Sequence, residues 1–327
     1  MEFVTNLASY IVPFVVVLTI IVFVHELGHY WVARRCGVRV EVFSIGFGPE
    51  LFGWYDRHGT RWKISAVPLG GFVKFFGDAD AASAADGATI AAMSDQDRKD
   101  SFHFKTLPQR SAIVVAGPVA NFIFAILVYA ALFSIIGQPF TPPVVGDVLP
   151  NSAAADAGLK PGDRITAADG SAIQRFQDLQ TYVALRAETP IDLTVRRDGS
   201  DLHITVVPRR VDAPNGVGGT ERVGQIGIRT SGIEFVRHDP VTSVGLAAKE
   251  TWQVVANTFT YLGRIAQGRE SGDQLSGPLG IAKMSGDVAK ASWLGLVQLM
   301  ATLSVAIGLI NLFPVPMLDG GHLLFPL

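Results

Sequence analysis

The chain has 327 residues, of which 49% are hydrophobic and only 17% are charged, whereas soluble proteins average about 25% charged residues. Its formal net charge of -2 excludes the strongly basic surface that is typical of nucleic-acid-binding proteins. The single cysteine, Cys36, excludes an intramolecular disulfide framework. These totals favour a membrane protein with no nucleic-acid partner.

Three uncharged apolar stretches predict membrane-spanning helices. They cover residues 7–24, 113–136 and 291–318, and each meets or exceeds the roughly 18–20 residues needed to cross a hydrocarbon core about 30 Å thick. The first stretch lacks the basic n-region and the small-residue cleavage site of a signal peptide, so we expect it to stay in the membrane. The predicted fold class is therefore a polytopic α-helical membrane protein.

Basic residues in the short flanks predict the orientation, because cytoplasmic segments beside membrane helices are enriched in Lys and Arg. Residues 34–110 carry such residues at both ends and should be cytoplasmic, with the N-terminus and residues 137–290 on the outer side. The basic residues are Arg34, Arg35, Arg39, Arg98, Lys99, Lys105 and Arg110.

The segment after the first helix predicts a β-hairpin followed by a loop. Residues 40–43 and 61–64 have the apolar and polar alternation of strands, and the apolar character of this stretch favours contact with the membrane surface. Residues 78–100 are rich in Ala, Ser and Asp and predict a flexible loop.

The outer segment predicts a small α+β domain. Strands are expected at 144–149, 191–197, 202–207 and 224–229, a helix at 176–187 and a loop at 208–223. The run Ala-Gly-Leu-Lys-Pro-Gly-Asp-Arg-Ile at 157–165 lies between the first strand and the helix, and the whole order resembles a PDZ domain of the permuted bacterial type. PDZ domains bind an extended peptide along a sheet edge, although a rigid spacer without a ligand remains the alternative.

These elements divide the chain into six parts. They are the first transmembrane helix (1–37), the membrane-associated β-hairpin and flexible loop (38–110), the second transmembrane helix (111–138), the PDZ-like domain (142–231), an amphipathic linker (232–290) and the third transmembrane helix (291–327).

An H-E-x-x-H motif, His25-Glu26-Leu27-Gly28-His29, lies at the end of the first apolar stretch. Residues four apart share one face of a helix, so both imidazoles can bind one Zn²⁺ while Glu26 accepts a proton from metal-activated water. Ionisable groups within a membrane helix are costly and usually functional. A polar helix end without a metal is the competing interpretation.

A third zinc ligand is needed, because catalytic zinc normally has three protein ligands and an open position for water. Asp319 is the best candidate, since the third stretch should return to the same side of the membrane as the two histidines. Pro314 and Pro316 break that helix, and irregular backbone at membrane depth is tolerated inside protein or around a wet cavity. His322 is the alternative ligand.

Together these motifs resemble the site-2 protease family, most closely the bacterial branch that contains the sigma-E regulator protease. The resemblance spans nearly the whole chain. It rests on H-E-L-G-H at 25–29, G-P-V-A-N at 117–121, the outer PDZ-like domain, S-G-P-L-G-I at 276–281 and N-x-x-P-x-P-x-L-D-G at 311–320.

The resemblance implies a role for each matching residue. His25, His29 and Asp319 would bind zinc, and Glu26 would be the general base. The residues expected near the substrate or the oxyanion are Asn311, Gly117, Pro118 and Asn121, and residues 117–121 would also help to pack or shape the site. The family's membrane-associated β-hairpin would map onto residues 40–77 and offer an edge to an unwound substrate.

The resemblance also implies a location and substrates. We expect a multi-pass protein of the bacterial inner membrane with a periplasmic PDZ-like domain and an active site near the cytoplasmic side. Its substrates would be single-span membrane proteins such as anti-sigma factors, already trimmed outside the membrane by another protease. Better-known relatives carry two PDZ domains and a further helix after the Leu-Asp-Gly motif, so a fourth span is expected beyond the three seen here.

The function predicted from the sequence is therefore intramembrane zinc-dependent proteolysis. A membrane-anchored PDZ scaffold with an inactive metal site is one alternative, and a zinc transporter or sensor is another. Neither of these requires a glutamate directly after the first histidine, so the enzyme is favoured.

Overall fold

The computed structural model describes residues 2–78, 92–214, 220–267, 277–316 and 318–324. The chain forms two compact units. Unit 1 contains residues 1–132, 240–266 and 272–327, and unit 2 contains residues 133–239 and 267–271.

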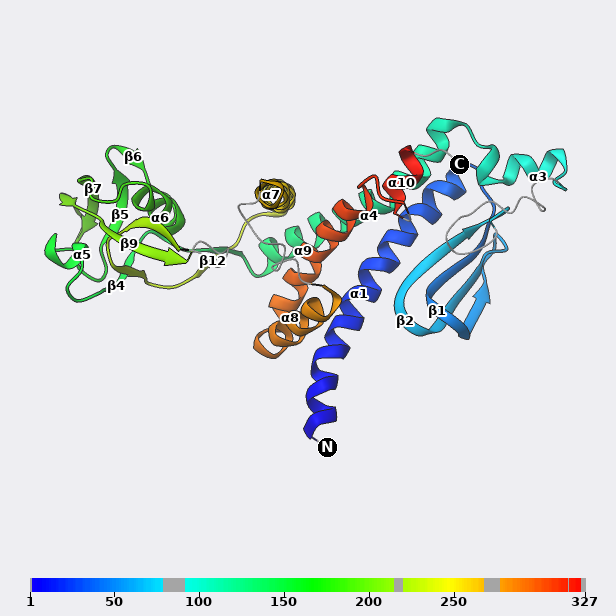
Figure 1. The fold of residues 1–327 in the computed structure, drawn as a ribbon, viewed down its shortest axis with the longest axis horizontal. Helices are drawn as coiled ribbons and strands as arrows, with labels where there is room; N and C mark the ends of the chain where they lie inside the picture. Colours follow the sequence, from blue (N-terminus) through cyan, green and yellow to red (C-terminus); the bar gives the residue numbers. More distant parts are fainter. Residues whose placement is uncertain (1, 79–91, 215–219, 268–276, 317, 325–327) are drawn as a thin grey trace. The chain divides into compact units, whose positions relative to one another are not determined.

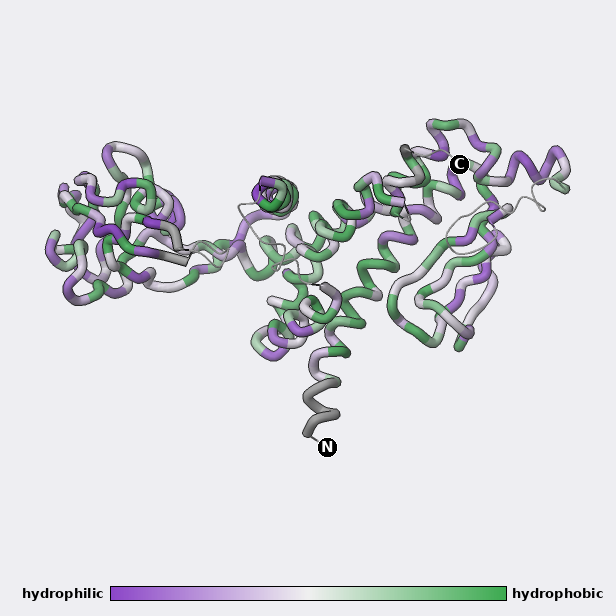
Figure 2. Tube along the Cα trace, viewed as in Figure 1, coloured by the Kyte–Doolittle hydropathy of each residue, from purple (hydrophilic) through white to green (hydrophobic). Residues whose placement is uncertain are grey.

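Three helices of unit 1 are long and apolar enough to cross a membrane, as the sequence predicts. They are α1 (Glu2–Arg35), α4 (Leu107–Ile135) and α9 (Trp293–Asn311), and the candidate span in α1 is Ala8–Arg35. Figure 2 shows all three as largely hydrophobic along their length. The third helix ends earlier than the apolar stretch at 291–318, because Pro314 and Pro316 follow it.

Small residues allow the three helices to approach closely. If Gly28 of α1 carried a side chain, its Cβ would overlap the backbone carbonyl of Ala116 on α4. In the same way, a Cβ added to Gly308 of α9 would lie 3.1 Å from the Cβ of Asn121 on α4. Such residues are typical of helix contacts within membranes, where no hydrophobic driving force brings helices together. The site described below forms where these contacts occur.

Two long paired strands follow the first helix, and they extend well beyond the strand segments expected at 40–43 and 61–64. Strands β1 (Val40–Tyr55) and β2 (Arg61–Phe75) pair antiparallel from Val40 opposite Phe75 to Tyr55 opposite Arg61, and both curve beside α1 (Figure 1). Repeated register shifts interrupt the pairing.

Asp56 in the hairpin turn anchors the hairpin to α1. Its carboxylate accepts hydrogen bonds from Tyr30 Oη on α1 at 2.6 Å and from Trp62 Nε1 on β2 at 3.0 Å. It also accepts from the backbone N–H groups of His58 and Thr60 at 2.8 and 2.9 Å. One carboxylate therefore closes the turn and attaches it to the membrane helix.

The loop expected over 78–100 is only partly described, because residues 79–91 lie outside the described residues. Within the remainder the expectation is wrong at Asp95–Asp100, which form helix α3, and a short 3₁₀ helix, η1 (Phe102–Phe104), follows. Ser94 explains the start of α3, because its side chain accepts a hydrogen bond from the backbone N–H of Asp97.

Unit 2 is built around a four-stranded antiparallel sheet in the order β6-β5-β7-β8. These strands are Ser171–Ala172, Arg164–Ala168, Ile191–Arg197 and Ser200–Val206. Helices α5 (Ala153–Asp156) and α6 (Phe176–Ala184) contribute to the same buried core. Outside this sheet, β4 (Val145–Val148) pairs with β11 (Ile228–Thr230), and β3 (Gln138–Phe140) pairs with β12 (Glu234–Val236).

One expectation in unit 2 is wrong. Instead of a loop over 208–223, strands β9 (Arg209–Pro214) and β10 (Thr220–Gln225) pair antiparallel. The alternation of apolar and polar residues that marks a strand is hard to see in this stretch, because both strands carry charged side chains that lie in solvent. The exposed pair of Arg222 and Asp212 is an example.

The stretch expected as an amphipathic linker, 232–290, contains two helices of unit 1, α7 (Pro240–Ala266) and α8 (Pro278–Ala291). Helix α8 packs against the first half of α1, where a Cβ on Gly286 would overlap the ring of Tyr10. The Lys290 ammonium lies 3.7 Å from the centre of the same ring. The last described helix is α10 (Asp319–Leu324).

Candidate functional site

His25 and His29 lie one turn apart on the same face of α1, as their spacing predicts. Their Nε2 atoms are 3.2 Å apart, and the residues are only 7% and 8% exposed. Two nearly buried imidazoles facing each other inside an apolar helix need a common partner, because burying polar groups without one is costly.

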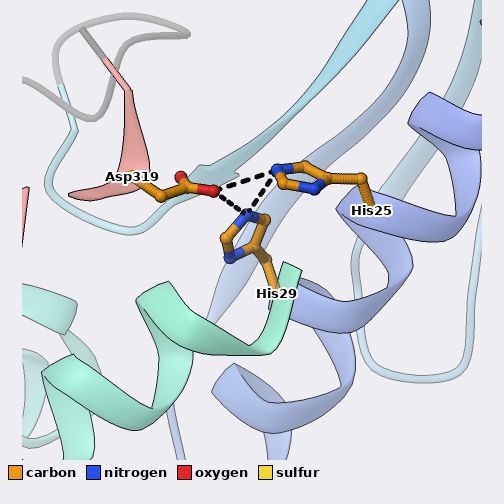
Figure 3. A group of neighbouring side chains, drawn as sticks. All are labelled: His25, His29 and Asp319. Atoms are coloured by element: carbon orange, nitrogen blue, oxygen red, sulfur yellow. Dashed lines mark hydrogen bonds and ion pairs between the residues drawn. The ribbon is translucent and has the colours of Figure 1, made fainter. Parts of the chain in front are cut away.

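Asp319 supplies that partner from the other end of the chain. Its Oδ2 atom lies 3.0 Å from His25 Nε2 and 3.4 Å from His29 Nε2, so that three atoms converge on one point (Figure 3). Among the residues that the structure describes, His25, His29 and Asp319 form the group of His, Cys, Asp or Glu side chains whose ligand atoms lie close enough together to hold a metal ion.

The backbone after α9 explains how Asp319 reaches the histidines. The helix ends at Asn311, and the chain then turns through hydrogen bonds from Phe313 N to the Ile310 carbonyl and from Leu318 N to the Val315 carbonyl. A Cβ on Gly320 would overlap the carbonyls of this turn. The two prolines and this glycine therefore fold the chain back, so that α10 begins at the carboxylate.

The three converging atoms fit a zinc ion. His29 Nδ1 lies 2.9 Å from the carbonyl oxygen of Ile113; a carbonyl can only accept, so Nδ1 donates and Nε2 keeps a lone pair. Two imidazole nitrogens and one carboxylate oxygen form a ligand set typical of catalytic zinc. Tetrahedral zinc with ligand bonds of about 2.0–2.1 Å holds neighbouring ligand atoms about 3.3 Å apart, close to the spacing found here.

A cavity of about 300 Å³ lies beside these ligands. Glu26 lines it, and its carboxylate accepts a hydrogen bond from the backbone of Val73 on β2. Asn311, the last residue of α9, lines the same cavity, as do residues 70–73 of the hairpin. The structure therefore brings the predicted base, one predicted substrate contact and the hairpin around one space next to His25, His29 and Asp319.

The other three residues expected near the substrate lie elsewhere. Gly117, Pro118 and Asn121 of α4 are not among the cavity-lining residues. Gly117 faces the ring of His29, and Asn121 is fully buried with its side-chain amide 3.2 Å from His25 Nδ1. The placement of Gly117 and Asn121 against the histidines favours support of the imidazoles over substrate contact, whereas the carbonyl of Pro118 faces Gly308 on α9.

Two contributors to the site could not be recognised in the sequence. The carbonyl of Ile113 and the backbone N–H of Val73 are main-chain groups, and every residue carries such groups. Gly28 was visible inside H-E-L-G-H, yet its role as a contact point for α4 depends on helix packing. The side chain of the alternative ligand His322 lies outside the described part of the chain.

Comparison with known proteins gives one family. The pattern of Peptidase family M50 matches residues 13–327. Relatives from Agrobacterium fabrum and Rhizobium meliloti, each named "Putative zinc metalloprotease", are 50% and 47% identical. Each alignment covers 98% of this chain, with 86% of the first relative and 87% of the second. Metalloprotease MmpA of Caulobacter vibrioides is 44% identical over 96% of this chain and 84% of its own length.

Solved structures, among them one from Listeria, resemble part of the chain. The PDZ domain of an SdrC-like protein from Listeria innocua is 20% identical and covers 27% of this chain and 92% of its own, with a TM-score of 0.22. A score this low carries no inference about fold or ligand.

Proposed function

Because the chain belongs to peptidase family M50, the site-2 protease family, and is a zinc metalloprotease, we propose that it cuts peptide bonds in or near the membrane-spanning segments of other membrane proteins. The observation that carries this proposal is the position of the ligand group. His25 and His29 lie within the candidate span Ala8–Arg35 and meet Asp319 beside a cavity.

In this proposal His25, His29 and Asp319 hold the metal, and Glu26 is the general base. When held there, zinc would acidify a water molecule and polarise the carbonyl of the bond to be cut. The Glu26 carboxylate accepts the proton that the attacking water loses and then transfers it to the leaving amine nitrogen. The Asn311 side chain, at the rim of the cavity, hydrogen-bonds to the substrate carbonyl.

The hairpin presents the substrate in an extended form. A helical substrate keeps its amides in internal hydrogen bonds, so it must unwind before it can be cut. Within the described residues the hairpin is a two-stranded sheet, and residues 70–73 of β2 border the cavity. A substrate strand that pairs along a free sheet edge regains the backbone hydrogen bonds that unwinding removes.

The exposed apolar side chains of the hairpin support contact with the membrane surface. Leu51, Phe52 and Tyr55 are 71%, 62% and 67% exposed, and such a group of apolar residues marks an interaction surface. We place the protein in the bacterial inner membrane, with the Arg- and Lys-rich flanks of α1 and α4 in the cytoplasm. Unit 2 then faces the periplasm.

Unit 2 selects substrates by size. A groove of about 400 Å³ lies between residues of α6, among them Leu179 and Val183, and residues 223–228. In our proposal this PDZ-like unit excludes proteins that have not first been trimmed outside the membrane, such as intact anti-sigma factors. Deletion of residues 142–230 should then allow longer substrates to be cut, and unchanged selectivity would refute the gating role.

The central experiment compares cleavage of a pre-trimmed single-span substrate by the wild type and by Glu26→Gln. The variant should bind zinc normally and cut nothing, because glutamine cannot accept the proton from water. Glu41→Gln, which changes a hairpin glutamate paired with Lys74, is the matched control and should cut normally. Equal cleavage by the wild type and Glu26→Gln would refute the assignment of the base.

A further inference from the structure

Asn121 is a buried polar residue in the middle of the membrane helix α4. The residue is 0% exposed, and its side-chain Nδ2 lies 3.2 Å from Nδ1 of His25. His25 uses its other nitrogen, Nε2, to face Asp319. The amide of Asn121 therefore meets the imidazole on the side away from the proposed zinc site.

The chemistry of the His25 ring specifies what Asn121 must provide. A neutral imidazole that binds metal through Nε2 carries its proton on Nδ1, so Nδ1 needs a hydrogen-bond acceptor. The amide oxygen of asparagine is such an acceptor, and rotation of the amide by 180° exchanges its oxygen and nitrogen without changing its shape. Asn121 Oδ1 is buried with no hydrogen-bond partner among the residues described, so it is free for this role.

Helix α9 holds Asn121 in place. Ser304 Oγ donates a hydrogen bond to the backbone carbonyl of Asn121 at 3.0 Å. One turn later, a Cβ on Gly308 would lie 3.1 Å from the Cβ of Asn121. Ser304 and Gly308, which lie one turn apart, therefore hold α9 in close contact with the backbone and Cβ of Asn121. The amide of Asn121 remains directed at His25.

We propose that Asn121 is a positioning residue for the zinc ligand His25, whose Nδ1–H donates to Asn121 Oδ1. This bond fixes the ring orientation and keeps the lone pair of Nε2 directed at the metal. His29 receives the same support from the carbonyl of Ile113, which no substitution removes. The inference rests on the proposed function, because it requires His25 to be a zinc ligand.

The test measures zinc affinity of the full-length protein in detergent by equilibrium competition with a chromogenic chelator. Asn121→Leu keeps the approximate volume and removes the acceptor, so its affinity should fall by about 10–100-fold, the usual cost of losing such a partner. Asn121→Asp keeps both the shape and an acceptor and should stay within a few-fold of the wild type. If Asn121→Leu does not accumulate, Asn121→Ala gives the same readout.

Ser304→Ala separates positioning from packing. It removes a contact between α4 and α9 without touching His25, and its zinc affinity should remain near that of the wild type. Wild-type affinity in the variants without an acceptor would overturn the proposal. So would equal losses in Asn121→Leu, Asn121→Asp and Ser304→Ala, because that pattern indicates packing alone.

His25→Ala distinguishes failure of this inference from failure of the proposed function. A loss of zinc in this variant supports the ligand assignment whatever the Asn121 variants show. If His25→Ala binds zinc as tightly as the wild type, the ligand assignment itself fails, and the positioning role fails with it.

Discussion

Gly117 of α4 lies against the imidazole of His29, so closely that a Cβ at position 117 would overlap the Nε2 atom and its neighbours in the ring. The overlap involves the nitrogen that faces Asp319. A glycine at this position therefore makes room for the imidazole of His29, the proposed metal ligand, and this points to a role of the G-P-V-A-N segment that differs from contact with the substrate.

Gly117→Ala should displace the His29 ring and weaken zinc binding by at least about tenfold, since loss of ligand orientation commonly costs 10–100-fold. Gly245→Ala on α7 is the matched control, because a Cβ there meets no atom within 4 Å. The control should bind zinc normally. Equal zinc affinities for the two variants, measured by chelator competition, would contradict this role of Gly117.

Removal of the metal should stop cleavage reversibly. A chelator such as 1,10-phenanthroline should inactivate the wild type, and added zinc should restore cleavage. Asp319→Asn removes the anionic ligand and should lower zinc affinity by more than the roughly 100-fold upper cost of losing a supporting partner. Asp287→Asn, at an exposed position on α8, should change neither zinc affinity nor cleavage; a parallel loss in both variants would point to a general effect of charge.

Tyr30→Phe should loosen the hairpin turn while leaving the metal site intact. It deletes the hydrogen bond from α1 to the Asp56 carboxylate, and hydrogen bonds to charged groups contribute about 1.5–3 kcal/mol. Hydrogen–deuterium exchange of residues 55–62 should accelerate, with unchanged zinc content. Tyr55→Phe is the control, because it removes the hydroxyl of a tyrosine that is 67% exposed. If residues 55–62 exchange as fast in Tyr55→Phe as in Tyr30→Phe, the anchoring role of Asp56 is refuted.

Unit 2 should lose stability in acid through Asp163. Burial raises the pKa of this carboxyl, but the bidentate hydrogen bonds from Arg197, both 2.7 Å, outweigh it and lower the pKa below its usual value. The stability gained from the ion pair is present above the unfolded pKa of about 3.9 and is lost as the pH falls through the lower folded pKa.

Hydrogen exchange of residues 158–166, corrected for the intrinsic rate at each pH, measures this effect in the full-length protein. The wild type should keep its opening free energy from pH 7 to about pH 5 and lose part of it below about pH 4. Arg197→Gln should already be weakened at pH 7, by about 3 kcal/mol or more, because it leaves a buried charge unpaired. An identical pH dependence in both proteins would exclude the ion pair as the cause.

The sequence predicted the parts of the structure that depend on local periodicity. The three long helices follow from uninterrupted apolar stretches, and the facing pair of His25 and His29 follows from 3.6 residues per turn. Asp319 was predicted on different grounds, because two prolines had to end the third helix at the depth of the histidines. Its convergence with both imidazoles agrees with that reasoning.

The sequence did not reveal features that depend on packing between distant segments. The alternation of side chains predicted strands only at 40–43 and 61–64, and the hairpin over 40–77 came from the family resemblance. Gly46 and Gly48 adopt positive φ angles and register shifts recur along the pair, so the alternation is interrupted. The direction of the Asn121 side chain depends on the rotation of α4 against α1. That rotation is set by contacts such as Gly28 against Ala116, which no single segment encodes.

The proposed zinc ligands His25 and Asp319 lie far apart in the sequence, and this has a consequence for biosynthesis. Both histidines leave the ribosome early, whereas Asp319 emerges only after the second membrane helix, unit 2 and the third membrane helix have been made. A nascent chain therefore lacks a complete hydrolytic centre while it is being inserted beside other unfolded membrane segments. We expect the protease to stay inactive at least until Asp319 has emerged, which spares neighbouring chains in the insertion machinery from premature cleavage.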